Sequence, residues 1–561
     1  MSKAESPSKN RKIKIGGRLG GLLLAAMVLV LLVIFGIFYL QKISEREKLA
    51  GYLPADRTVA FLEYNLEPGR QDASRLTSLL LQNNWLKQLN DGMQSFIPYP
   101  DQFQKWYSGR GGLTILSSPN QQDFRTALFL GVADNDRVTD WIDSLLLDKT
   151  SDAVLDEDYY GQKLISFRKG QYMNILWTKD YLVFSDDKEV LESIAGALTG
   201  KTLSLHTLPS YNQLSSALPE ENLGFIYLDR NKLLSVLSRN ETFLAGRLQL
   251  FKLYFPFLSL ISTEAIAFQL DNPAAEHPTL TAKHLALFDP SQLPDKSLFE
   301  TEYFYHGDLE KLLPPGNLLL AGGANLLDQK NKLQSYLTAA SPLNNLIFQG
   351  ALNSVRDLAG NSTGNFDLDS DFFPLFQKDY LFFLDVAAAG KYNFGLLVQS
   401  DQPANDLLKM EKFILAVGPQ LASRILAKPV AVTLPDGTTG SEIKASLNAP
   451  TISRTETAGL PIEQIEFAPD FSLYLVADQD KKLLLVTNSP GTIQDILQQA
   501  PNAAQTAQDY GLDKPTEAYF LDTGKLPALL PAAAALKPLQ YIKAARKFTE
   551  IGILSTYQFG L

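Results

Sequence analysis

The residues best suited to chemistry are three aspartates at alternate positions, Asp367, Asp369 and Asp371. This spacing is typical of a calcium-binding loop, which also needs a glycine after the third acid and a bidentate glutamate at its twelfth position. The chain has Phe372 and Lys378 at those two places. We therefore expect helix capping, in which an aspartate oxygen accepts hydrogen bonds from free helix N–H groups.

Two further motifs match known active sites only in part. Ser441-Glu442-Ile443-Lys444 fits Ser-x-x-Lys, the nucleophile motif of penicillin-binding enzymes, but the Ser-Asp-Asn and Lys-Thr-Gly motifs are absent. This serine also falls in an expected strand after a turn. Gly109-Arg110-Gly111-Gly112 lacks the glycine spacing and the Lys-Ser/Thr pair of a phosphate loop. We expect a turn there, leading into a strand that starts at Leu113.

Metal-ligating residues are scarce. The chain has no cysteine, and its histidines are His206, His277, His284 and His306. His277 and His284 lie seven residues apart without a third ligand nearby, so we expect both to be surface histidines. The acidic run 156–158 precedes two tyrosines and a glycine, and we expect a solvated turn there rather than a catalytic pair.

No order of serine, histidine and acid suggests a triad, which is recognised by geometry. We therefore expect no catalytic residue, no cofactor and no metal site of ordinary type. Replacing Ser441, Asp369 or His284 with alanine should leave function intact.

The composition describes a large globular protein with an uneven charge. Its 561 residues suit two or three domains, and 45% hydrophobic and 10% aromatic residues exclude wholesale disorder. Residues 1–40 contain six basic side chains against Glu5, a net charge of +5. Because the whole chain carries −10, residues 41–561 carry −15. Such an acidic region repels phosphate backbones, so we expect no nucleic-acid partner.

An uncharged apolar segment runs from Leu19 to Leu40. Its 22 residues, at about 1.5 Å each, are long enough to span a bilayer core of roughly 30 Å. The basic stub 1–18 favours a cytoplasmic N-terminus. A signal peptide would have a shorter apolar core ending at a small-x-small site, which the sequence around Leu40 lacks. We expect an uncleaved single-pass transmembrane helix with the bulk of the chain extracytoplasmic. Leu248 to Ser262 is too short and too interrupted for a second span.

The rest of the chain contains an internal repeat, with four matches in the same order. The stretches that begin at Leu53 and Leu313 match, as do those that begin at Leu113 and Tyr380. The other two matches pair the stretches that begin at Leu182 and Leu484, and at Tyr227 and Phe520. The third match predicts a strand, an N-cap cluster (185–187 or 487–489) and an amphipathic helix.

The repeat predicts an α+β fold class: the transmembrane helix, then two tandem copies of an α+β domain with mainly antiparallel sheets. The expected copies are residues 41–295 and 296–561, the second with an insertion near 415–456. Turn-rich residues 434–442 in that insertion are typical of a hairpin tip.

The C-terminal segment is expected to leave a sheet edge exposed. The first half ends in two alternating runs that suit a hairpin, near 261–272 and 280–289, whereas the second half ends after one such run. The second sheet should then lack one strand. We expect either that another segment covers the edge formed by residues 552–561, or that the natural chain continues.

Leu53-Pro54-Ala55-Asp56-Arg57-Thr58, the stretch 366–371 before a helix, and the strand–cap–helix matches resemble domain-of-unknown-function family 3352. The resemblance implies a membrane-anchored protein of the bacterial cell envelope, and it carries over no catalytic residues.

The absence of reactive clusters favours a non-catalytic scaffold or interaction module of the envelope. One alternative is an ectodomain that binds a lipid or peptide in a pocket between the repeats. A second is an enzyme with an unrecognised site, which would need carboxylates or histidines converging in one pocket. The expected partners are membrane lipid through the anchor helix, and envelope proteins or a small apolar ligand.

Overall fold

The computed structural model describes much of the chain beyond Leu49. The described residues are 49–82, 105–147, 154–169, 171–239, 260–291, 293, 303–340, 345–346, 348–350, 352–354, 366–386, 392–425, 428–433, 438–444, 449–457, 459–498, 509–529 and 539–561. The expected transmembrane helix at 19–40 and the apolar stretch 248–259 lie outside them. No helix among the described residues is both long enough and apolar enough to cross a membrane.

The chain divides into two compact units. The first contains residues up to Asn212 together with Glu221–Leu228. Its strands are β1 (Thr58–Asn65), β2 (Tyr107–Ser117), β3 (Phe124–Val132), β4 (Val154–Tyr159), β5 (Gln162–Lys169), β6 (Gln171–Trp177), β7 (Tyr181–Ser185) and β8 (Gly224–Asp229). This part of the chain also forms helices α2 (Gln71–Gln82), α5 (Asn135–Leu147) and α6 (Lys188–Leu198), whereas α7 (Pro209–Ala217) is divided between the two units.

The pairing of these strands is antiparallel throughout and gives the order β4-β5-β6-β7-β3-β2-β1-β8. Strand β7 is buried along its whole length, which explains its continuous apolar sequence. Helix α6 buries Val190, Leu191 and Ile194 and contacts β3, β6 and β7. Its apolar residues recur at helical spacing, so burial of this face holds it in place.

The second unit contains Gln213–Glu220 and Asp229–Leu561. Its strands are β9 (Ile261–Asp271), β10 (Thr279–Phe288), β11 (Leu319–Ala324), β12 (Asp379–Val386), β13 (Tyr392–Gln399), β14 (Lys428–Thr433), β15 (Thr439–Lys444), β16 (Thr451–Thr457), β17 (Leu460–Ala468), β18 (Phe471–Asp478), β19 (Leu483–Thr487), β20 (Glu517–Asp522), β21 (Tyr541–Phe548) and β22 (Gly552–Gly560). Its helices include α8 (Arg230–Arg239), α11 (Leu326–Ala340), α13 (Pro403–Ile425), α14 (Pro490–Gln498) and α15 (Leu526–Leu529).

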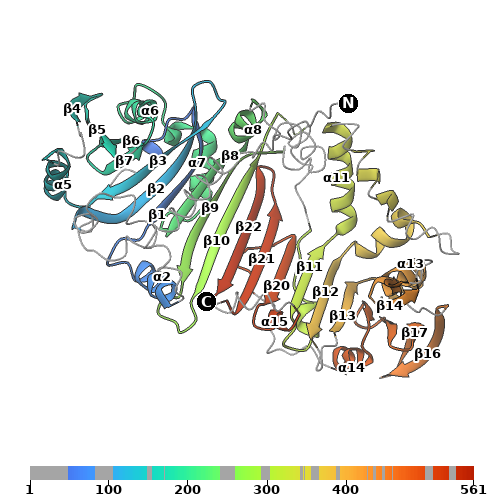
Figure 1. Ribbon diagram of the computed structural model, residues 1–561. Coiled ribbons are helices and arrows are strands. Elements are labelled where there is room, and N and C mark those ends of the chain that lie inside the picture. The colour runs from blue at the N-terminus through green and yellow to red at the C-terminus, as the bar shows by residue number, and fades with distance from the viewer. Residues whose placement is uncertain are drawn as a thin grey trace, which may run out of the picture. The chain divides into compact units, whose positions relative to one another are not determined.

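The strands of this unit, apart from β14 and β15, pair in the order β16-β17-β18-β19-β13-β12-β11-β20-β21-β22-β10-β9. Two apolar clusters contain residues of this sheet. One includes Leu381, Leu397 and Ile493, and the other includes Met410 and Phe467 on α13 and β17. Figure 1 shows β20, β21, β22, β10 and β9 following one another across the sheet.

The expected two tandem α+β domains with separate sheets are wrong. Strands β1–β13 and β16–β22 belong to one antiparallel sheet of 20 strands. One physical reason is edge pairing. Strand β10 belongs to the expected first copy, but it pairs with the outer side of β22 in the expected second copy over nine residue pairs, from Thr279–Gly560 to Leu287–Gly552. The sequence repeat is therefore a repeat of strand order inside one sheet: β2-β1-β8 recurs as β12-β11-β20.

The same pairing answers the question of the C-terminal edge. Another segment covers that edge, which is the first of the two expected alternatives, because β22 pairs with β21 on one side and β10 on the other. The expected loss of one strand is wrong. Two strands, β21 and β22, follow β20, just as β9 and β10 follow β8, because Thr549 and Gly552 close a tight turn.

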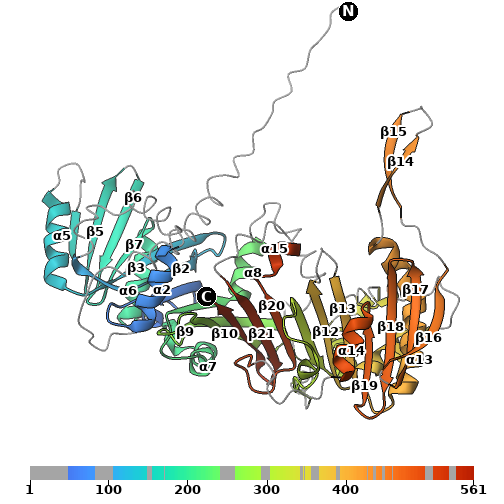
Figure 2. The same ribbon diagram turned by 90° about the horizontal axis from the view of Figure 1, so that it is seen from below.

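The insertion near 415–456 forms the expected hairpin. Strands β14 and β15 pair from Lys428–Lys444 to Thr433–Thr439 and make a separate two-stranded sheet. Figure 2 shows this pair as a ribbon of its own.

Candidate ligand-binding site

A pocket of about 640 Å³ lies in the second unit, where several strand ends and a helix start meet. In Figure 1, β11, β12 and β13 lie side by side, and α11 follows directly from β11. The pocket is lined by Tyr303, Phe304, His306, Ala324, Asn325, Leu327, Asp328, Asn331, Gln377, Lys378, Asp379 and Gln399. Its volume is in the range of small-molecule sites.

Asn325 turns the chain from β11 into α11. Its φ of 48° lies in the left-handed region, which asparagine tolerates better than most residues. Its side-chain oxygen accepts a hydrogen bond from the Asp328 amide at 3.0 Å, and its own amide donates to the Lys378 carbonyl at 3.2 Å. This residue therefore caps the helix and ties it to the segment before β12.

The segment 303–306 is held in place by Tyr305. Its amide donates to the Pro515 carbonyl at 2.7 Å, and its hydroxyl donates to Glu310 at 3.1 Å. The ring packs on Gly322 of β11, where a Cβ atom would overlap the ring. Only glycine leaves room for this tyrosine. Because Tyr305 points into the core, its neighbours Phe304 and His306 are placed at the pocket.

His306 and Asp379 form a polar pair in the pocket. The His306 amide donates to Asp379 Oδ2 at 2.9 Å, and the imidazole Nδ1 lies 3.2 Å from the same oxygen. The Asp379 side chain is 6% exposed, whereas that of His306 is 52% exposed. Burial raises the pKa of Asp379, although the amide and ring of His306 act in the opposite direction. The carboxylate therefore orients the imidazole, and Nε2 is the ring nitrogen that this contact leaves available.

The other charged side chains of the pocket lining also have partners. Lys378 Nζ lies 2.6 Å from Asp401 Oδ2, and Asp328 Oδ2 lies 2.9 Å from Lys332 Nζ. The nearby Lys378 and Lys482 lower the pKa of Asp401. The lining therefore carries little uncompensated charge.

A model of the protein family described as "Protein of unknown function (DUF3352)" matches residues 22–406. This match covers more than half of the chain. The chain belongs to the DUF3352 family. No curated protein and no solved structure matches it. All residues that line the pocket lie within the matched part of this DUF3352 protein.

Two of the three alternating aspartates of the DUF3352 protein, Asp367 and Asp371, take part in capping, as predicted. Asp367 is the N-cap of the turn Leu368–Phe372 and accepts from the amides of Asp369 and Ser370 at 2.8 and 2.9 Å. The side chain of Asp371 accepts from the Asp367 amide at 3.0 Å. Asp369 lies 2.7 Å from Lys330, so its charge has a protein partner.

Histidine placement was predicted correctly for one residue of two. His277 is exposed, in agreement with the sequence. His284 lies on β10 with 17% of its side chain exposed, so the expected surface position is wrong. Its Nε2 lies 3.2 Å from Glu264, which also binds Arg230 through two hydrogen bonds of 2.8 and 3.0 Å. The antiparallel pairing of β9 with β10 brings His284 beside Glu264.

The remaining motifs lie on strands. Ser441 is on β15, as expected, next to the turn of its hairpin. The glycine run 109–112 lies inside β2 rather than in a turn before it, because the strand begins at Tyr107. The acidic run 156–158 is in β4, and the turn falls one step later, on Tyr160 and Gly161, which have positive φ angles.

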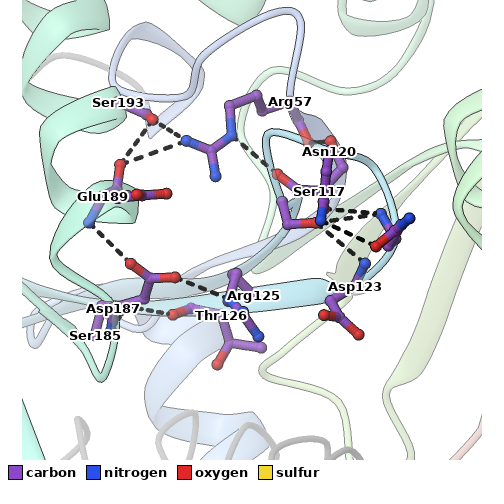
Figure 3. Close-up of polar contacts among 12 residues, drawn as sticks. Arg57, Ser117, Asn120, Asp123, Arg125, Thr126, Ser185, Asp187, Glu189 and Ser193 are labelled. Atoms are coloured by element: carbon purple, nitrogen blue, oxygen red, sulfur yellow. Dashed lines mark hydrogen bonds and ion pairs between the residues drawn. The ribbon is translucent and has the colours of Figure 1, made fainter.

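The residues that carry the family resemblance belong to a structural network rather than to the pocket. Figure 3 shows Arg57 between β2 and α6: its Nε donates to the Ser117 carbonyl at 2.9 Å, and its guanidinium also bonds to Ser193. Asp187 caps α6 through the Glu189 amide at 2.9 Å. These contacts join strands to a helix, and none of these residues lines the pocket of about 640 Å³.

Sequence reasoning missed the pocket because its central pair is non-local. His306 and Asp379 are 73 residues apart and come together through the loop before β11 and the start of β12. A usable signal was the single histidine directly after the aromatic run Tyr303 to Tyr305.

Proposed function

We propose that this DUF3352 protein is a ligand-binding protein of the cell envelope, attached to the membrane by residues 19–40. It holds a small polar molecule in the pocket beside His306. What carries the proposal is the convergence of an oriented His–Asp pair, several amides and an aromatic side chain on one cavity of about 640 Å³. The basic stub and the 22-residue apolar segment support the attachment.

The site differs in place from the pocket expected between the repeats, since all its lining residues lie between Tyr303 and Gln399. Its lining is also more polar than a lipid or apolar peptide requires. A scaffolding role is compatible with ligand binding, because a bound molecule can stabilise the form that meets a partner.

A variant that fills the pocket tests this function even while the ligand is unidentified. Asn331 lies on the exposed side of α11 and lines the cavity, so Asn331→Trp would block it with little effect on the core. Ser335→Trp is the matched control, because Ser335 is exposed one turn further along the same helix and does not line the pocket.

The measurement is a ligand-observed NMR screen of a chemically diverse fragment library against the full chain. We expect a set of fragments that bind the parent and Ser335→Trp but not Asn331→Trp. If every fragment that binds the parent binds all three proteins alike, the pocket is not a binding site and the proposal is wrong.

One observation favours a second candidate, an enzyme that uses His306 as a general base. With Nδ1 held by buried Asp379, Nε2 is oriented to take a proton from a bound hydroxyl or water. The test is recovery of a pocket ligand after incubation. A binding protein returns it unchanged, whereas an enzyme returns a product, and His306→Ala stops the conversion.

A further inference from the structure

The charged groups of the pocket restrict the chemistry of its ligand. Lys378 and Asp328 each face an opposite charge at 2.6 and 2.9 Å, on Asp401 and Lys332, and His306 Nδ1 lies 3.2 Å from Asp379. An ionised ligand would have to displace one of these partners before it gained a salt bridge. The lining therefore offers little net attraction to a charged molecule.

Unlike the charged groups, several uncharged polar groups of the pocket remain available to form hydrogen bonds with a ligand. Gln377 and Gln399 line the pocket, and neither side chain makes a hydrogen bond to any residue that the structure describes. Asn325 uses its oxygen to cap α11, and its NH₂ group makes no hydrogen bond within the described chain. Each amide combines an acceptor oxygen with two N–H donors. Such groups match hydroxyls, which donate and accept at once.

An aromatic face completes the lining. Tyr303 is 49% exposed at the pocket. The neighbouring Phe304 is already in contact with His306, with ring centroids 4.4 Å apart, and Lys514 Nζ lies 5.4 Å from its ring. Tyr303 is thus the ring that can stack on a ligand. The C–H face of a sugar ring is weakly positive and apolar, which suits the negative face of an aromatic ring.

We infer that the ligand is a neutral, hydroxyl-rich molecule, the end of a short saccharide, held by Gln377, Gln399 and Asn325 and stacked on Tyr303. This inference rests on the proposed ligand-binding function and names the class of ligand for the same pocket.

The test is binding of defined sugars to the full chain, kept in a polyoxyethylene detergent because alkyl glycosides would compete. The neutral probes are cellobiose, maltose and N,N′-diacetylchitobiose, and the anionic probes are digalacturonate and inorganic phosphate. We expect at least one neutral sugar to bind. Its affinity should change by less than about twofold between about 0.05 and 0.5 M salt, because no ion pair is screened.

The double variant Gln377→Ala/Gln399→Ala should weaken that binding about tenfold, which corresponds to about 1.4 kcal/mol. Gln213→Ala is the control, because Gln213 is exposed on α7 and does not line the pocket. Tyr303→Ala should weaken binding as well, whereas Tyr303→Phe should preserve it, since stacking needs the ring and not the hydroxyl.

Three results would overturn the inference that the ligand is a saccharide. These are binding of the anionic probes alone, no binding of any neutral sugar, or equal binding of a neutral sugar by the parent and the double variant. The fragment screen distinguishes a failure of the proposed ligand class from a failure of the proposed binding function. If fragments bind in the pocket and sugars do not, the ligand class is wrong and the binding function stands. If neither binds there, both are wrong.

Discussion

At the scale of single residues, the protein places its charged groups in compensated sets. The clearest set outside the pocket is Arg230, Glu264 and His284, whose side chains are only 14 to 21% exposed. Burial alone would raise the pKa of Glu264, but hydrogen bonds and charges from His284 and Arg230 outweigh it and lower that pKa from 4.5 to about 2. The carboxylate thus stabilises the fold while it is ionised.

Glu264→Gln should lower the free energy of unfolding by about 2 kcal/mol at pH 7, because Arg230 then keeps a partly buried charge without its partner. A depressed pKa stabilises the fold above the ordinary value of 4.5 and loses this effect as pH falls through about 2. Denaturant titrations should therefore show the difference between variant and parent shrinking over that window. The exposed Glu276→Gln is the control, and an equal effect of both substitutions would contradict the assignment.

At the scale of elements, local sequence signals correctly predicted the strands, helix caps, helices and hairpins that depend on residues close together in the chain. The strand–cap–helix pattern at 182–194 became β7, the Asp187 cap and α6. Its counterpart became β19 and α14, with Ser489 near the helix start. Alternating sequence also predicted β9 and β10 as a hairpin. Each signal depends on residues close in the chain, so a single sequence contains it.

Pairing between distant strands was not predictable in the same way. β10 and β22 are separated by more than 250 residues, and neither contains a turn or cap that marks its partner. Both strands show a similar alternation of apolar and polar residues, which does not specify a partner strand. The sequence therefore suggested two separate sheets where the structure has one. The His306–Asp379 pair was hidden for the same reason.

The N-cap of α6 offers a matched pair of neighbouring substitutions. Asp187→Ala should lower the free energy of unfolding by about 1 kcal/mol, because it removes the bond to the Glu189 amide. It also removes the 2.9 Å ion pair with Arg125 shown in Figure 3. Asp186→Ala should have almost no effect, since that side chain is exposed and does not cap the helix. Thermal and denaturant unfolding provide the measurement, and equal effects of the two substitutions would exclude capping by Asp187.

The closure of the C-terminal edge can be tested by hydrogen exchange. β22 is paired on both sides, so the amides of 552–560 should be protected throughout, including those that face β10. β16 pairs with β17 alone among the described strands, so its outward amides should exchange at least about tenfold faster. Fast exchange at alternate positions of β22 would show that the contact with β10 does not persist in solution.

At the scale of the whole molecule, charge and hydropathy separate a short basic N-terminal part from a large acidic remainder. Residues 1–40 carry +5 and residues 41–561 carry −15. Positive charge on one side of an apolar segment favours a cytoplasmic position for that side, so the proposed orientation places the pocket outside the cytoplasm.

We predict that protease added to intact spheroplasts removes nearly all of the chain beyond about residue 42 and leaves the N-terminal segment protected. A cytoplasmic protein in the same sample should stay intact and serves as the control for lysis. Replacing the six basic residues of the stub with serine should reduce the fraction of accessible chains, because the charge difference that sets the orientation is then lost. Survival of the bulk of the parent protein would place the pocket inside the cell. An envelope saccharide could then no longer be its ligand, although the pocket could still bind a soluble sugar of the cytoplasm.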